Sequence, residues 1–126
     1  MQPLVLTYNL QPEKLAKLRV LCLRLGIRIH IVQPEEYGLP IGALAGMTSA
    51  PEGETPAEPF ADEMLVMAAF RPGMLDAFLN GFRQSRIPPV ALKAMVTETN
   101  AGWTSPELHR AILEEHEMMR QAQKKK

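Results

Sequence analysis

The chain has 126 residues, 46% hydrophobic and 22% charged, and its 14 basic and 14 acidic side chains give a formal net charge of zero. This composition predicts one globular domain, residues 1–126, and its balanced charge argues against a protein drawn to nucleic acid or to an anionic membrane. The single cysteine, Cys22, excludes an intrachain disulfide and a cysteine metal cluster and favours a reducing compartment.

The first residues give no sign of export or membrane insertion. Residues 1–7 lack a basic region followed by the apolar core of a secretory signal, and no apolar run approaches the roughly 20 residues that a membrane helix requires. We therefore expect a soluble, cytoplasmic protein with no membrane partner.

A shift of 60 residues aligns two parts of the chain without a gap. The apolar run 4–6 falls on 64–66, and the other matched pairs are Leu10 with Phe70, Pro12 with Pro72, Leu15 with Leu75, Leu18 with Phe78, Cys22 with Phe82 and Ile27 with Ile87. Few of these are identities, so we infer a repeated structure and claim no gene duplication. Each unit predicts a strand, a helix with proline in its first turn, and a second strand.

In the first unit, apolar side chains recur on one face of a helix that begins near Pro12 and ends at Gly26, a plausible C-cap; they are Leu15, Leu18, Cys22 and Leu25. The strand 27–32 follows and alternates cleanly, with Arg28 and His30 on its second face.

The connection 34–62 is far longer than a hairpin loop. Residues 35–63 contain seven acidic side chains and no lysine or arginine. Residues 48–59 have the composition of a disordered segment, whereas 37–44 are apolar enough to dock against the body. The connection is either a tolerated surface insertion or a lid or partner-binding loop, and it could also fold back on the basic end of the chain.

The second unit repeats the pattern with a strand at 63–70, a helix whose apolar stripe runs from Met74 to Phe82, a stop at Pro88-Pro89, and a strand at 90–96 whose one charge is Lys93. A third helix is predicted from about Ser105 to Gln123, and its end overlaps a basic, frayed tail at 121–126. Its inner side should carry Leu108, Ala111, Ile112, Glu115 and Met119. It could cover the free face of the sheet or pack on another subunit.

Two successive β-α-β units predict an α+β fold. The simplest arrangement is a ferredoxin-like double βαβ sandwich (β-α-β-β-α-β), with four antiparallel strands, two helices on one face, an added C-terminal helix and a long connection between the second and third strands. A small open α/β sheet is the alternative.

The densest set of polar side chains lies at 97–108, between the last strand and the last helix. Thr104 and Glu107 have the spacing of a capping box, and Trp103 and Leu108 have that of a hydrophobic staple. These features explain the helix start without any ligand.

They do not explain Thr97, Thr99 and Asn100, which either form the turn or line a pocket at the helix N-terminus, where free N–H groups favour an anion. If the protein binds a small anionic ligand, we expect it at Thr97, Thr99, Asn100 and Trp103.

Other chemistry finds little support in the residue spacing. His109 and His116 lie two helical turns apart, about 10 Å, which is too far to share one metal ion without other ligands. Cys22 lies on an apolar stripe and is better explained as a core residue than as a nucleophile. We predict no catalytic residues, no metal and no cofactor, and the third strand lacks the basic-aromatic pattern of an RNA-binding sheet.

Residues 90–104 read VALKAMVTETNAGWT, and together with Leu108 and the pair Glu115-His116 they resemble a family of short bacterial proteins known only as a domain of unknown function. The resemblance covers most of the chain, including the opening strand and helix and residues 70–82, and the Thr-Asn-Ala-Gly-Trp string is a specific part of it. It implies a bacterial cytoplasmic protein and brings no activity. At the level of fold alone, the double unit with a long central loop is similar to P-II-type signalling proteins, although their nucleotide-binding residues are not found here.

Taken together, the sequence leaves the function unknown and favours a non-enzymatic ligand-sensing or interaction module, with self-association as one possibility. One alternative is a small enzyme that acts on an anionic metabolite at the 97–103 turn, with Asn100, Thr97 or Thr99 and either His109 or His116. The other is a structural module that docks its loop or last helix on a partner, which an exposed apolar patch near Met118 and Met119 would support.

Overall fold

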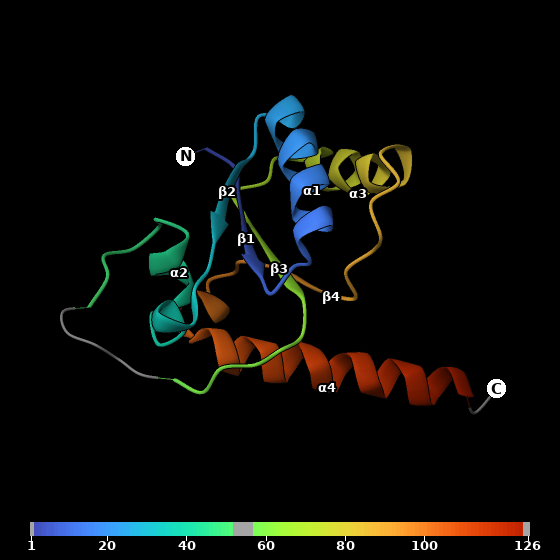
Figure 1. Cartoon of the computed structure of the whole chain (residues 1–126). Helices are drawn as coiled ribbons and strands as arrows, with labels where there is room; N and C mark the ends of the chain where they lie inside the picture. The colour runs from blue at the N-terminus through green and yellow to red at the C-terminus, as the bar shows by residue number, and fades with distance from the viewer. Residues whose placement is uncertain (1, 52–56, 125–126) are drawn as a thin grey trace.

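Two β-α-β units and a long C-terminal helix make up the fold (Figure 1). The computed structural model describes residues 2–51 and 57–124. In chain order the elements are β1 (Leu4–Tyr8), α1 (Pro12–Leu25), β2 (Arg28–Ile31), the 3-10 turn η1 (Pro34–Glu36), α2 (Ile41–Leu44), β3 (Met64–Ala68), α3 (Met74–Gln84), β4 (Leu92–Met95), the 3-10 turn η2 (Asn100–Gly102) and α4 (Ser105–Lys124).

The four described strands form one mixed sheet in the order β2-β1-β3-β4. β1 pairs with β2 in parallel, β3 pairs with β4 in parallel, and the central pair β1–β3 is antiparallel. The α+β fold built from two β-α-β units is confirmed. The prediction of four antiparallel strands is wrong, because each crossover helix returns the chain to the position beside the strand it left.

The reason for the difference lies in the connection between β2 and β3. A ferredoxin-like sheet separates the two strands of each unit, whereas here β2 lies beside β1 at one edge and β4 beside β3 at the other. A short turn after β2 would force β2 to pair with β3. The long connection removes that constraint, since it carries the chain from the β2 edge to the centre of the sheet.

The internal repeat is visible in the backbone. β3 begins and ends 60 residues after β1, and Leu6 pairs across the sheet with Val66, its equivalent in the repeat. Left-handed backbone also recurs at this spacing: Asn9 and Ala69 follow the first strands with φ of 58° and 59°, and Gly26 and Arg86 end the helices with φ of 74° and 54°. The two units are therefore related by an approximate twofold axis between Leu6 and Val66.

One face of the sheet is covered by α1 and α3, which lie side by side above it (Figure 1). The core on this side contains Val5, Leu65 and Met67 from the sheet, with Leu18, Leu21, Cys22, Phe78 and Phe82 from the helices. Burial raises the pKa of the Cys22 thiol to about 12, so it stays protonated at neutral pH. The expectation that Cys22 is a core residue is confirmed.

The other face is covered by the segment 34–47 and by the first half of α4. Tyr37, Ile41 and Leu44 are buried against Leu6, Tyr8, Met64 and Val66, so residues 37–44 dock as expected. Of the segment predicted to be disordered, 48–59, residues 52–56 lie outside the described part of the chain.

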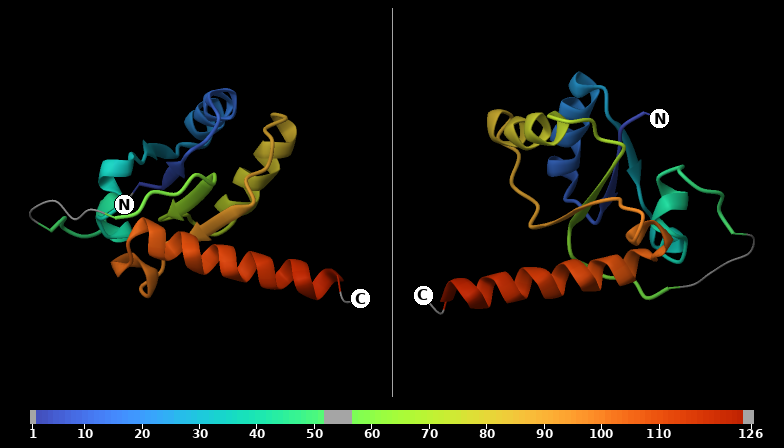
Figure 2. Two further views of the ribbon diagram at one scale, coloured as in Figure 1. Left: turned by 60° about the horizontal axis from the view of Figure 1, so that its bottom comes forward. Right: turned by 180° about the vertical axis from the view of Figure 1, so that it is seen from behind.

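The second half of α4 extends past the sheet and away from the body (Figure 2). Leu108 is buried and Ile112 packs against the same core, as the helical spacing predicts. Leu113, which was not expected on the inner side, packs there too. Glu115 and Met119, which were expected on the inner side, are exposed. Helical periodicity places both residues on the same side of α4 as Leu108 and Ile112. They are exposed because the sheet ends before the helix does.

The repeat leads to a prediction for Arg86. Arg86, which follows the C-cap Ser85 of α3, has the left-handed backbone that Gly26 has after α1. The next residue makes the same closing hydrogen bond in both units, Ile27 N to Cys22 O and Ile87 N to Phe82 O, each 2.8 Å. A side chain in this conformation is strained, so Arg86→Gly should raise the free energy of unfolding by about 0.5–1 kcal/mol.

Urea denaturation of Arg86→Gly and of the matched variant Gly26→Ala checks this expectation. Gly26→Ala should lower the stability by about 1 kcal/mol, since it introduces the strain that Arg86→Gly removes. A midpoint for Arg86→Gly that is unchanged or lower would contradict it.

Candidate functional site

The 97–103 turn is held by the side chain of Asn100. Its Oδ1 accepts a hydrogen bond from the Thr97 amide at 2.8 Å, and its Nδ2 donates to the carbonyl of Met95 at 3.0 Å. The Asn100 amide donates to Thr97 Oγ1 at 3.1 Å. Asn100 is buried, and these bonds tie the end of β4 to η2. They explain Asn100 as a residue that closes a turn.

The start of α4 has the predicted capping box. The Thr104 amide donates to Glu107 Oε1 at 3.1 Å, and the Glu107 amide donates to Thr104 Oγ1 at 3.4 Å. A hydrogen bond from the Thr104 backbone amide, and to a smaller extent one from the Thr104 hydroxyl, lower the pKa of the Glu107 carboxyl. The cap is therefore formed at neutral pH and is lost only as the pH falls through that lowered pKa.

Of the four residues predicted to bind a ligand, the structure joins three. Thr97 and Asn100 bond to each other, and the Trp103 amide donates to the Asn100 carbonyl at 3.0 Å. The Trp103 carbonyl in turn accepts from the Ile41 amide at 2.8 Å, which fastens the turn to α2. Thr97 and Thr99 are exposed. These contacts serve the fold, and a ligand at this turn stays a prediction.

The two helix histidines lie in different surroundings. His109 Nε2 is 2.8 Å from Asp62 Oδ2, and its ring stacks on Phe60 at 4.1 Å between centroids and 6° between planes. His116 is half-buried further along α4. The contacts of His109 are with the returning end of the long connection, so they give this side chain a different role from the one that a reaction with Asn100 would require.

Phe60 is the centre of an aromatic cluster that sequence reasoning missed. Its ring stacks on Tyr37 at 4.9 Å and lies 5.6 Å from Tyr8. Asn9 Nδ2 donates to the carbonyls of Phe60 and Asp62, at 2.7 and 3.0 Å. These contacts of Phe60 and Asp62 with Asn9 and Tyr37 fix the end of the connection to the sheet, and we call this end the strap. A large apolar residue within an otherwise acidic segment was the available signal.

The tyrosines of this cluster are structural. Tyr8 and Ser105 share a buried hydrogen bond of 2.7 Å between their hydroxyls, which joins β1 to the first residue of α4. Burial raises the pKa of Tyr8, and burial also raises the pKa of Tyr37. Both phenols are therefore neutral hydrogen-bonding groups at physiological pH.

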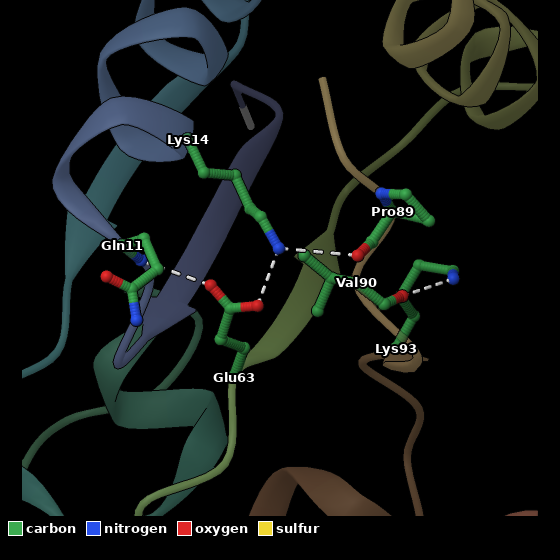
Figure 3. Close-up of polar contacts among 6 residues, drawn as sticks. All are labelled: Gln11, Lys14, Glu63, Pro89, Val90 and Lys93. Atoms are coloured by element: carbon green, nitrogen blue, oxygen red, sulfur yellow. Dashed lines mark hydrogen bonds and ion pairs between the residues drawn. The ribbon is translucent and has the colours of Figure 1, made fainter. Parts of the chain in front are cut away.

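A second polar cluster, also missed from the sequence, joins the two repeats (Figure 3). Lys14 Nζ lies 2.6 Å from Glu63 Oε1 and donates to the carbonyl of Pro89 at 3.3 Å, while the Gln11 amide donates to Glu63 Oε2 at 3.1 Å. The Lys14 side chain is only 10% exposed, and that of Glu63 is 26% exposed. The signal in the sequence was the position of Lys14 on the buried stripe of α1, four residues before Leu18.

Two clefts lie near these groups. One, of about 630 Å³, runs along the start of α1 and the Pro88 turn and is lined by Gln11, Glu13, Lys14 and Lys17. The other, of about 330 Å³, separates α4 from the β4 side of the sheet, and the residues that line it include Asp62, Glu63, Leu92, Leu113, His116, Glu117 and Arg120. We call the second one the α4 groove.

Two further features bear on the kind of site. Within residues 2–51 and 57–124, no three histidine, cysteine, aspartate or glutamate side chains are grouped so that they could hold a metal ion. In the same part of the chain, no helix combines the length and the apolar character needed to cross a bilayer.

Comparison with known proteins finds one family model that matches part of the chain. Residues 63–119, which run from just before β3 into the second half of α4, match a domain of unknown function (DUF3783). The match includes the 97–103 turn and excludes β1, α1 and β2, so it is shorter than the resemblance implied. No curated protein and no solved structure matches the chain. These findings leave the function unknown.

A structural role for Asn100 predicts a loss of stability when its side chain is removed. Asn100→Ala leaves the Thr97 amide and the Met95 carbonyl without their partners, which should cost about 1–3 kcal/mol in the free energy of unfolding. Thr99→Ala, at an exposed neighbour, should stay within about 0.5 kcal/mol of the parent protein. Chemical denaturation of both variants is the measurement, and equal stabilities would contradict the role.

The Lys14–Glu63 pair should behave as a buried pair whose two members depend on each other. Either Lys14→Met or Glu63→Leu leaves one charge poorly solvated, and because Glu63 keeps some contact with solvent we expect each to cost about 1–3 kcal/mol. The double variant should lose less than the sum of the two. Denaturation of all four proteins gives the coupling energy, and strict additivity would show that the pair is not coupled.

Proposed function

We propose that this protein is a non-enzymatic interaction module that binds another polypeptide through the second half of α4. The observation that carries the proposal is the exposure of two adjacent large apolar side chains there, Met118 at 70% and Met119 at 61%. Exposed methionines are typical of binding surfaces, because their flexible side chains adapt to a partner.

The geometry of α4 supports this proposal. Met119 lies seven residues after Ile112 and eleven after Leu108, which places it on the same face of the helix as these core residues. The apolar face of α4 thus continues beyond the sheet that it covers. A helical segment of about ten residues has little stability alone in water, so contacts with a partner would stabilise the second half of α4.

Two of the side chains that favoured an enzyme make structural contacts. Asn100 bonds within its turn, and His109 contacts Asp62 and Phe60. The resemblance at 97–103 and the single buried thiol further support a protein of the bacterial cytoplasm. The small-ligand site at Thr97, Thr99, Asn100 and Trp103 is not needed for this function.

The test is a photocrosslinking amino acid placed at position 119 of the full chain, with position 23 as the control. Leu23 is 84% exposed on α1, so it offers equal access on a different surface. In cells that express the protein, we expect a covalent protein adduct from position 119 and none from position 23. No adduct from position 119, or equal adducts from both positions, would overturn the proposal.

A further inference from the structure

The second β-α-β unit is longer than the first at one point. The chain takes 24 residues to pass from β1 to the paired position on β2, from 4 to 28, but 28 residues to pass from β3 to β4, from 64 to 92. The units still match at Ile27 and Ile87, which make the same closing hydrogen bond. The extra residues are therefore 88–91, between that bond and the start of β4.

Two lysines hold this extra segment, residues 88–91, in place (Figure 3). Lys14 of α1 donates from Nζ to the carbonyl of Pro89 at 3.3 Å. Lys93 of β4 donates from Nζ to the carbonyl of Val90 at 2.5 Å. The Val90 side chain is buried in the core under the two crossover helices. The segment therefore has a fixed path, and a cleft that it borders is preformed.

A cleft of about 390 Å³ lies between the extra segment and α3, and we call it the α3 cleft. This volume falls within the range of known small-ligand sites, about 300–1,000 Å³. Arg83 and Lys93 are its two charged lining residues, and none of the described residues that line it is acidic. The rest of the lining is apolar: Leu79, Phe82, Ile87, Pro89 and Val90.

The repeat itself does not require the α3 cleft. At the positions that match Leu79, Phe82 and Arg83, the first unit has Arg19, Cys22 and Leu23, and it has no counterpart of the extra segment. The cleft and its two cationic side chains are thus a property of the second unit alone.

We propose that the α3 cleft binds a small monocarboxylate with an apolar body, at a site separate from the one proposed for α4. The planar guanidinium of Arg83 matches the two oxygens of a carboxylate. Lys93 uses one of the three hydrogens on Nζ for Val90 and keeps two for a ligand. Arg83 is exposed and Lys93 is half-buried, so the carboxylate lies at the mouth of the cleft.

The lining favours this class of ligand over its two halves. An inorganic anion would leave the apolar walls uncovered, and a neutral hydrocarbon would leave the two cationic side chains without a partner of opposite charge. A carboxylate that carries a hydrocarbon chain satisfies both, because the chain covers Phe82 and Val90 while the charge meets Arg83 and Lys93.

The test uses hexanoate as the probe, with acetate and hexan-1-ol as matched probes that lack the chain or the charge. An NMR titration of the full chain, labelled with ¹⁵N, gives both the affinity and the place of binding. Hexanoate should bind in the millimolar range and shift the amide signals of the residues that line the α3 cleft. Acetate and hexan-1-ol should each bind at least about tenfold more weakly.

Variants at the mouth of the cleft test the role of the charge. Arg83→Gln with Lys93→Gln should weaken hexanoate binding at least about tenfold and leave the binding of hexan-1-ol unchanged, since only the acid uses these side chains. Arg83→Gln alone, at an exposed position, should weaken it by a smaller factor and guards against loss of folding in the double variant. Circular dichroism checks the fold of each variant.

The control removes the same amount of charge from another surface. Arg19→Gln with Arg24→Gln, at exposed positions of α1, should leave the affinity for hexanoate unchanged. An affinity that falls as much in this control as in the Arg83 variants would overturn the proposal, because it would show a general effect of net charge.

Three other results would overturn the proposal. They are equal affinities for hexanoate and hexan-1-ol, shifts that centre on the 97–103 turn, and the absence of any shift with hexanoate. Crosslinking from position 119 does not involve the α3 cleft, so each of these results leaves the proposed function of α4 standing.

Discussion

The antiparallel pairing of β1 with β3 is the contact on which the rest of this structure depends. All five residues of β3 are buried, as are four of the five in β1, so the central pair needs cover on both faces. The two crossover helices supply one cover. The other is assembled from α2 and α4, which come from outside the repeat. The approximate twofold symmetry of the sheet is therefore lost on its second face.

This asymmetry explains where the polar clusters lie. The strap of Asn9, Phe60 and Asp62 brings the long connection back to the start of β3, and Glu63 at its end then meets Lys14. Both clusters join parts of the chain that the repeat alone would leave separate. Their buried hydrogen bonds favour one path for the connection, because a displaced strap would leave Lys14 without its carboxylate.

The predictability of each site feature followed the distance between its partners along the chain. The capping box and the Thr97–Asn100 contacts join residues three apart, so residue type and spacing were enough to suggest them. Lys14 meets Glu63 across 49 residues and Pro89 across 75, and Tyr8 meets Ser105 across 97. No local pattern encodes such contacts. The exposed end of α4 was named from the sequence as a possible patch, but its extent depends on where the sheet ends.

The sequence by itself determined the two β-α-β units, the bounds of their helices to within a few residues and the docking of 37–44, because hydrophobic periodicity and helix-capping residues act locally. Only the tertiary structure decided which edge of the sheet β2 and β4 each occupy. The apolar pattern makes β1 and β3 central in either topology, and a connection as long as this one permits both choices. The length of α4 left uncovered was likewise a tertiary outcome, since the helix continues by its own hydrogen bonds after the sheet beneath it has ended.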